Sequence, residues 1–252
     1  MAFVSHGDSG VPMTINAERF LAAPVTTPAD GMVLSRLPFC LPGVYRPQAD
    51  THLLASVVAA EPSLAGRRVL DACAGTGAVA LTAALVGGGE VTAIDVCWRA
   101  VLSTRLNAWY LGLPVRVHRT SFVELDVAEP FNLVLANPPY VPCGSTAAPA
   151  GKARCWDAGL DGRALLDPLC AIAPRLLAPA GCLLLVQSDV SGVDASLGLL
   201  RSGGLLRARV VACRRVPFGP VMYARAAFLE AARLIEPGQR HEDLVVIRAD
   251  RP

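Results

Sequence analysis

A short segment, Asn137-Pro138-Pro139-Tyr140, combines an amide, two prolines and a phenol ring. Each proline has a fixed φ and no backbone N–H, so the segment is rigid and rich in hydrogen-bond acceptors. The apolar run at 131–136 predicts a buried strand directly before it. We therefore expect the segment at the end of a strand, where its amide and carbonyl groups can meet a ligand.

These groups suit an acceptor with a planar –NH2, such as a carboxamide or the amino group of adenine. Its lone pair is delocalised, which makes the nitrogen a poor nucleophile. The side-chain carbonyl of Asn137 and the backbone carbonyl of Pro138 can each accept one N–H, and the Tyr140 ring can stack on the plane. Positioning can supply about 7–11 kcal/mol in favourable cases. Attack on a methyl sulfonium needs no prior general base, because the proton can leave afterwards. The structural alternative is a strand-ending turn with a packing tyrosine.

A second motif, Asp71-Ala-Cys-Ala-Gly75-Thr-Gly77, lies between a predicted strand and a predicted helix. Glycines let a ligand approach the backbone, and a helix N-terminus offers free N–H groups. Asp95 ends the next predicted strand and can accept both hydroxyls of a ribose. The same glycine spacing, with Ala80, fits a dinucleotide fingerprint. A nicotinamide dehydrogenase and a plain strand–turn–helix therefore remain alternatives.

Two features favour S-adenosylmethionine (SAM) over a dinucleotide. Asp71 suits contact with a ligand ammonium, directly or through water, whereas a pyrophosphate would be repelled by it. The segment at 137–140 supplies the matching acceptor chemistry.

Strand and helix patterns alternate from residue 67 onward, which predicts an α/β fold with a doubly wound, mostly parallel seven-stranded sheet. Strands are expected at 67–73, 90–96, 114–120, 130–137, 181–190, 206–216 and 243–250. Helices are expected at 51–60, near 78–86, from 98, up to 177, near 192–202 and near 222–234. Asp50 or Thr51 is expected to cap the first of these helices. Both motifs then fall at the carboxyl ends of strands, where such sheets bind ligands.

The composition fits one buried core. Of the 252 residues, 53% are hydrophobic, and the mean hydropathy is +0.43. We divide the chain into an N-terminal extension, 1–43, and a catalytic domain, 44–252. A net charge of +2 gives no electrostatic case for nucleic acid as the main partner. The sequence shows neither an apolar run long enough to span a membrane nor a signal-peptide pattern, so a cytoplasmic location is expected.

Eight cysteines are scattered along the chain without a C-x-x-C pair. This spacing predicts buried thiols and no metal site. Cys143 and Cys155 flank the loop after the 137–140 segment, and their role stays open.

Taken together, the motifs resemble the SAM-dependent methyltransferases of the HemK type, which methylate the glutamine side-chain nitrogen in the Gly-Gly-Gln loop of peptide-chain release factors. VLDACAGTGAVAL and VTAIDV are similar to their cofactor motifs, ANPPYVP to their acceptor motif and WDAGLDGRALLD to the stretch that follows it. GVYRPQADTHLL resembles a Tyr-x-Pro-x-x-Asp-Thr stretch of the shorter, archaeal and eukaryotic branch, which lacks the N-terminal helical domain. Within the family, the sequence is therefore most similar to the short branch.

The resemblance implies a role for particular residues. Those expected to hold SAM or line its pocket are Tyr45, Thr51, Asp71, Ala74, Gly75, Gly77, Asp95, Val96 and Asn137. Those expected to hold the acceptor amide are Asn137, Pro138 and Tyr140. Thr120-Ser121-Phe122 lacks the acid often found near the adenine, so adenine contacts are not assigned there.

The sequence thus predicts a SAM-dependent N-methyltransferase acting on a protein glutamine, with a release factor as the first candidate substrate. Adenine N6 in nucleic acid, a protein lysine and a small molecule are the alternative acceptors. A SAM-binding module without catalysis is a further alternative. Eukaryotic members of the short branch use a small activator subunit, and the sequence leaves open whether this protein needs one.

Overall fold

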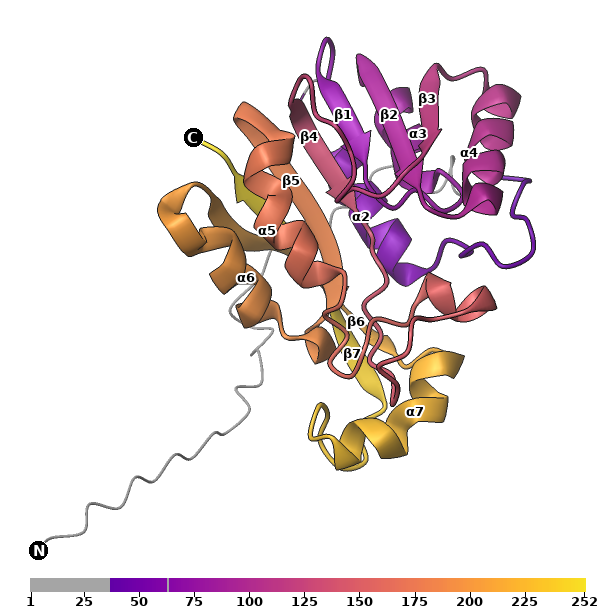
Figure 1. The fold of residues 1–252 in the computed structure, drawn as a ribbon, viewed down its shortest axis with the longest axis vertical. Helices are drawn as coiled ribbons and strands as arrows, with labels where there is room; N and C mark the ends of the chain where they lie inside the picture. The colour runs from indigo at the N-terminus through magenta and orange to yellow at the C-terminus, as the bar shows by residue number, and fades with distance from the viewer. Residues whose placement is uncertain (1–36, 63) are drawn as a thin grey trace, which may run out of the picture.

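A seven-stranded sheet in the order β3-β2-β1-β4-β5-β7-β6 runs through the part of the chain that the computed structural model describes, residues 37–62 and 64–252 (Figure 1). The strands are β1 (Arg68–Asp71), β2 (Glu90–Asp95), β3 (Val115–Arg119), β4 (Phe131–Ala136), β5 (Leu177–Ser188), β6 (Arg207–Pro217) and β7 (His241–Asp250). β1 to β5 pair in parallel, and β7 lies antiparallel between β5 and β6. The predicted fold class is confirmed.

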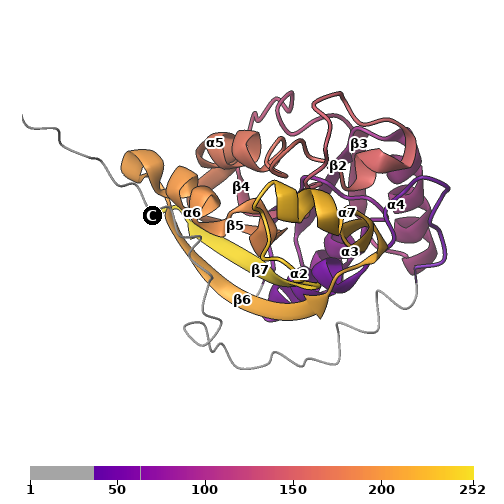
Figure 2. The same cartoon turned by 90° about the horizontal axis from the view of Figure 1, so that it is seen from below.

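Helices cover both faces of this sheet. They are α2 (Ala49–Ala59), α3 (Ala78–Leu85), α4 (Trp98–Leu111), α5 (Leu166–Leu176), α6 (Val193–Arg201) and α7 (Pro220–Ala231), with short 3-10 turns η2 (Gly151–Cys155), η3 (Asp189–Ser191) and η4 (Ser202–Gly204). Figure 2 shows α5 and α6 on one side and α2 and α3 on the other. Val69 packs into the cluster of α2 and α3, while its neighbour Leu70 packs into that of α5 and α6. This alternation is the period of two that a strand imposes.

The central strands are apolar on both faces. In β4, every residue from Leu133 to Ala136 is fully buried. Parallel strands covered by helices on both sides require such uninterrupted apolar runs. This burial explains the high mean hydropathy of the chain. Among the described helices, none combines the length and the apolar character that a membrane span needs.

Most predicted boundaries differ from the structure by one to four residues, and some of these differences have a clear physical reason. β5 begins at Leu177 because this residue already pairs with Phe131 across a register shift. α7 begins at Pro220, whose fixed φ suits the first position of a helix. The expectation that Asp50 or Thr51 caps the first helix is wrong: the N-cap of α2 is Gln48, without a side-chain bond. Asp50 is instead used in the site described next.

The first described residues lie along α4. The backbone N–H of Phe39 donates to Asn107 Oδ1 at 3.1 Å, and Asn107 Nδ2 donates to the Phe39 carbonyl at 2.8 Å. The N–H of Leu41 donates to Ser103 Oγ at 3.1 Å. Most of the predicted extension, residues 1–36, lies outside the described residues.

Candidate active site

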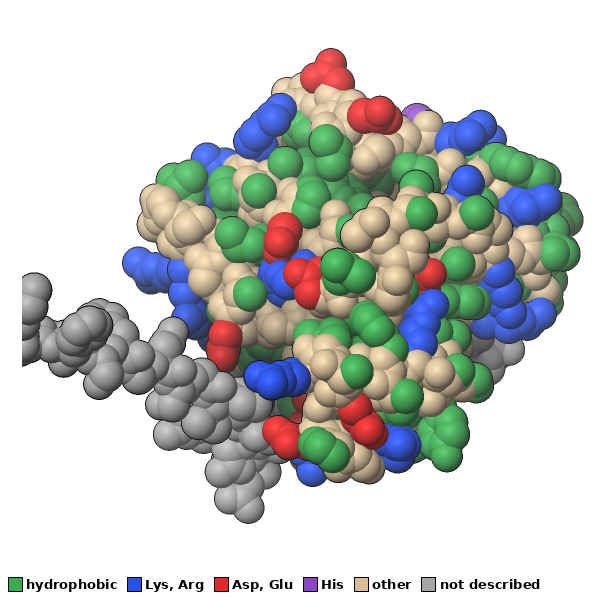
Figure 3. Space-filling model, turned by 60° about the horizontal axis from the view of Figure 1, so that its bottom comes forward, with side chains coloured by type: hydrophobic (Ala, Val, Ile, Leu, Met, Phe, Trp, Pro, Cys, Tyr) green, Lys and Arg blue, Asp and Glu red, His purple; other side chains and the backbone are tan. Residues whose placement is uncertain are grey.

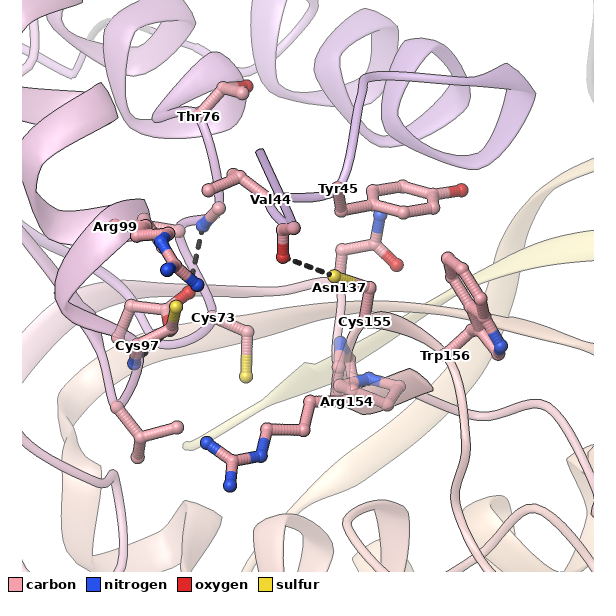
Figure 4. Close-up of a pocket in the computed structure, with 18 of the residues that line it drawn as sticks. Val44, Tyr45, Cys73, Thr76, Cys97, Arg99, Asn137, Arg154, Cys155 and Trp156 are labelled. Carbon is pink, nitrogen blue, oxygen red and sulfur yellow. Dashed lines mark hydrogen bonds between the residues drawn. The ribbon is translucent and has the colours of Figure 1, made fainter. Parts of the chain in front are cut away.

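A cavity of about 540 Å³ opens at the carboxyl ends of β1, β2 and β4. Its wall includes these predicted site residues: Tyr45, Thr51, Ala74, Gly75, Asp95, Val96, Asn137, Pro138 and Tyr140. Tyr45 and Trp156 lie toward one end and Cys97 and Arg99 toward the other (Figure 4). The fold thus brings together the two motifs that the sequence separates.

Asp95 lies at the end of the cavity that the loop containing Gly75 forms. Its Oδ2 accepts from the N–H of Gly75 at 3.0 Å, and its Oδ1 accepts from the N–H of Cys97 at 2.8 Å. Burial raises the pKa of this carboxyl, and the two N–H groups oppose that rise. Each oxygen keeps a lone pair, so the carboxylate is oriented by the backbone and can still accept from ligand hydroxyls.

Asp71 does not line the cavity. It is 2% exposed, and its Oδ2 accepts from the N–H of Ala80 at 3.0 Å, in the first turn of α3. Burial raises the pKa of Asp71 to about 7. These contacts make it a cap for α3 supplied by the preceding strand, and a contact with a ligand ammonium stays a prediction.

Gly77 also faces away from the cavity. Its φ is +84°, and a Cβ there would lie 2.7 Å from Thr104 Cγ2. Thr104 Oγ1 in turn donates to the Gly75 carbonyl at 3.1 Å. Gly77 therefore serves the close packing of the loop on α4, while Gly75 and Ala74 form the cavity wall.

The other end of the cavity contains the amide of Asn137. Its Nδ2 donates to Asp50 Oδ2 at 3.1 Å and to Thr51 Oγ1 at 3.3 Å. Among the residues that the structure describes, none donates to Asn137 Oδ1. This oxygen is consequently available to an N–H of a ligand in the cavity.

Asp50 was not among the predicted site residues, although it sits in the Tyr-x-Pro-x-x-Asp-Thr stretch. It is 4% exposed. The hydroxyls of Tyr45 and Tyr140 donate to its Oδ2 at 2.9 and 3.1 Å. The N–H of Thr51 donates to its Oδ1 at 2.6 Å. One carboxylate thus joins the start of α2 to the turn after β4.

The two tyrosines act as donors in this cluster. Burial raises the pKa of both hydroxyls, and the negative charge of Asp50 raises them further. Both therefore keep their protons. Glu242 lies in the same electrostatic environment: burial raises its pKa to about 7, and the charges of Asp189 and Asp50 add to the rise. Its Oε2 is buried and has no hydrogen-bond partner among the described residues.

The loop after the 137–140 turn forms a further wall, which the sequence indicated only through its similarity to a family stretch. Val141 donates through its N–H to the Trp156 carbonyl at 2.7 Å. Arg225 of α7 donates to the Pro142 carbonyl at 3.0 Å and pairs with Asp157 at 2.6 Å. These hydrogen bonds and this ion pair hold Trp156 in the cavity wall, together with Lys152, Arg154 and Cys155.

The two cysteines left open by the sequence have different surroundings. Cys155 lines the cavity, and its Sγ donates to the Gly43 carbonyl at 3.1 Å (Figure 4). Burial raises the pKa of its thiol to about 11. Cys143 is buried and donates to the Ser145 carbonyl. Neither belongs to a disulfide, and the part of the chain that the structure describes has no cluster of side chains able to hold a metal ion.

Comparison with known proteins gives matches to methyltransferases. The family model "Methyltransferase small domain" matches residues 41–153. The chain is similar to a release factor glutamine methyltransferase of Deinococcus radiodurans, at 40% identity over 54% of this chain and 51% of that protein. A putative protein N5-glutamine methyltransferase of Methanocaldococcus jannaschii is 26% identical, over 73% of this chain and 92% of that protein.

In fold, the chain is similar to the 16S rRNA N2 G1207 methyltransferase of T. thermophilus, solved with AdoMet and guanosine. The TM-score is 0.55 at 19% identity, covering 84% of this chain and 46% of that one. The chain spans about half the length of the Deinococcus protein, 51%. The chain thus has the fold of the class I SAM-dependent methyltransferases, and the curated relatives reported above are release factor and protein N5-glutamine methyltransferases.

Proposed function

We propose that this protein transfers the methyl group of SAM to the side-chain amide of a protein glutamine, with the Gly-Gly-Gln loop of a release factor as the first candidate. One observation carries the proposal: the amide of Asn137 is held by its nitrogen, and its oxygen is left for an N–H donor in the cavity. The names of the relatives point to the same acceptor.

The cavity fits SAM in size and in chemistry. Its volume of about 540 Å³ lies in the range of cofactor sites, roughly 300–1,000 Å³. Asp95, fixed by two backbone N–H groups, would accept the ribose hydroxyls. Ala74, Gly75 and Val96 would lie along the nucleoside, and Tyr45 and Thr51 nearer the other end. When bound, SAM supplies a methyl group on a positively charged sulfur.

The acceptor amide would be positioned by two carbonyl groups of this chain. Asn137 Oδ1 and the Pro138 carbonyl would each accept one N–H of the glutamine, and the Tyr140 ring would close the wall behind it. An N–C bond would form at the glutamine nitrogen as the methyl C–S bond breaks. The sulfur would leave as a neutral thioether, and the nitrogen would lose one proton to water. No histidine lines the cavity among the described residues, so positioning supplies the catalysis.

The alternative acceptors receive less support from the structure. A protein lysine must first lose a proton, and the carboxylate beside Asn137, that of Asp50, already accepts hydrogen bonds from Tyr45, Tyr140 and Thr51. A nucleic acid would favour a continuous basic surface. Figure 3 instead shows Lys and Arg interspersed with Asp and Glu over the face at the carboxyl end of the sheet.

Labelled SAM and purified release factors of the source organism would test the proposal, with mass spectrometry to locate the methyl group. We expect methylation of the Gly-Gly-Gln glutamine, reduced about 100-fold or more in Asn137→Ala. Asn132→Ala is a matched control, because Asn132 lies in β4, the strand that Asn137 directly follows, and does not line the cavity. Transfer to nucleic acid, lysine or a small molecule, with no glutamine methylation, would contradict the proposal.

The same assay addresses a partner. Transfer that requires added cell lysate, while purified protein already binds SAM, would point to an activator subunit. A release-factor substrate also implies a cytoplasmic location, which cell fractionation would test.

A further inference from the structure

We propose that Asp50 is a positioning residue: its carboxylate sets which end of the Asn137 amide faces the cavity. This inference rests on the proposed function, because it concerns the acceptor site for an –NH2 group. It differs from the roles predicted from the sequence, which gave Asp50 only a helix cap and gave Asn137 no partner within the chain. The structural basis is the hydrogen bond from Asn137 Nδ2 to Asp50 Oδ2, at 3.1 Å.

An asparagine amide has two ends of opposite hydrogen-bonding character. The oxygen accepts and the NH2 donates, and a rotation of 180° exchanges them. Only one orientation suits a substrate whose –NH2 group is to be methylated. If the NH2 of Asn137 faced the cavity, it would place a donor against the N–H donors of the substrate. An isolated Asn side chain can adopt either orientation, so a neighbouring residue must select the one that suits the substrate.

A carboxylate is suited to this selection because it accepts hydrogen bonds and donates none when ionised. With Asn137 Nδ2 toward it, the contact is attractive, and the reversed amide would place oxygen against oxygen. Thr51 Oγ1, at 3.3 Å from Nδ2, can accept in support but can also donate. Asp50 is therefore the neighbour that penalises the wrong orientation.

The surroundings hold Asp50 itself in place. Its Oδ1 accepts from the N–H and the hydroxyl of Thr51, at 2.6 and 3.2 Å. Its Oδ2 accepts from the hydroxyls of Tyr45 and Tyr140. The residue also lies in the first turn of α2, where the helix dipole favours a negative charge. A buried network satisfied in this way fixes one geometry.

A reciprocal exchange tests this directly. We expect Asp50→Asn to lower kcat about 10- to 100-fold, with the Kd for SAM within about threefold of wild type, because Asn at this position no longer dictates the amide orientation. Asn137→Asp should lose at least as much activity, since it places two carboxylates together. The double variant D50N/N137D restores one donor facing one acceptor and leaves one oxygen of the introduced carboxylate for the substrate, so it should exceed N137D by tenfold or more.

Asp194→Asn is the matched control, because Asp194 is the second residue of α6 as Asp50 is of α2 and is exposed. It should keep wild-type kcat. A double variant no better than N137D would overturn the proposal. If Asp50→Asn does not fold, the comparison of N137D with the double variant still decides.

A second readout does not depend on any acceptor. The side-chain ¹H–¹⁵N signals of Asn137, assigned by their loss in Asn137→Ala, should exchange slowly with solvent in wild type. Asp50→Asn should speed their exchange tenfold or more, and Asp194→Asn should leave it unchanged. If no release factor is methylated but this loss of protection is seen, the proposed substrate fails and the role of Asp50 stands. Signals unchanged by Asp50→Asn would overturn that role whatever the substrate.

Discussion

At the scale of single residues, the acceptor end of the cavity depends on buried polar groups whose partners determine their chemistry. Tyr140 was expected to stack on a planar acceptor, and in the structure its hydroxyl also donates to Asp50. Asp71 was expected near the ligand, and in the structure its carboxylate accepts a hydrogen bond from the backbone of α3. A polar side chain at a strand end can contact a ligand or bond to the protein itself. The hydrogen-bond donors beside it decide which of the two it does.

Glu242 provides a prediction at this scale. Its pKa in the folded protein is about 7, raised by burial and by the neighbouring Asp189 and Asp50. The folded state then binds more protons than the unfolded state between about pH 4.5 and 7. The stability that Glu242 contributes is therefore fully present below about pH 4.5 and is lost as the pH rises through about 7.

Glu242→Gln should remove this pH dependence. The free energy of unfolding of the variant minus that of wild type should rise by about 1–3 kcal/mol between pH 5 and pH 8. Urea denaturation at several pH values would measure it, with exposed Glu236→Gln as a control. Equal differences at both pH values would show that Glu242 is not protonated at pH 5 in the folded protein.

At the scale of elements, α7 and the loop after β4 act as one unit. Arg225 donates to the Pro142 carbonyl and pairs with Asp157, on the two sides of the loop. The loop contains η2 and presents Lys152 and Trp156 to the cavity. A helix that lies outside the cavity thus determines the shape of one of its walls.

Arg225→Ala should loosen this wall. It leaves the partly buried Asp157 without its cation, at a cost of about 1–3 kcal/mol. We expect a KM for the acceptor about tenfold higher, faster proteolysis within 143–156 and little change in SAM affinity. Exposed Arg116→Ala, which breaks a pair with Glu90, is the control. Unchanged KM and proteolysis would show that other contacts hold the loop.

At the scale of the whole molecule, stability comes from a sheet buried on both faces. Leu135 of β4 lies between β1 and β5 and is fully buried. Leu135→Ala should lower the free energy of unfolding by about 2–5 kcal/mol, since it removes buried methyl groups and leaves a cavity. Urea denaturation would measure this, and Leu205→Ala, at a site 54% exposed, should change it by less than about 0.5 kcal/mol. A small loss at both sites would mean that the core closes around the gap.

The sequence alone determined the order and type of the elements, because apolar period and turn residues are local properties. It placed Asp95 and Asn137 at strand ends, and parallel strands with crossover helices necessarily bring those ends to one edge of the sheet. Both motifs, and their meeting at that edge, are therefore consequences of local sequence patterns.

Only the tertiary structure decided which partners these side chains have. Asp50 and Asn137 are separated by 87 residues, and no local pattern shows that the start of α2 packs against the turn after β4. The same holds for Arg225 and Asp157, and for the direction in which Asp71 points. Hydrogen bonds between buried groups depend on the packing of distant elements to within a few tenths of an ångström, and that packing is a property of the whole fold.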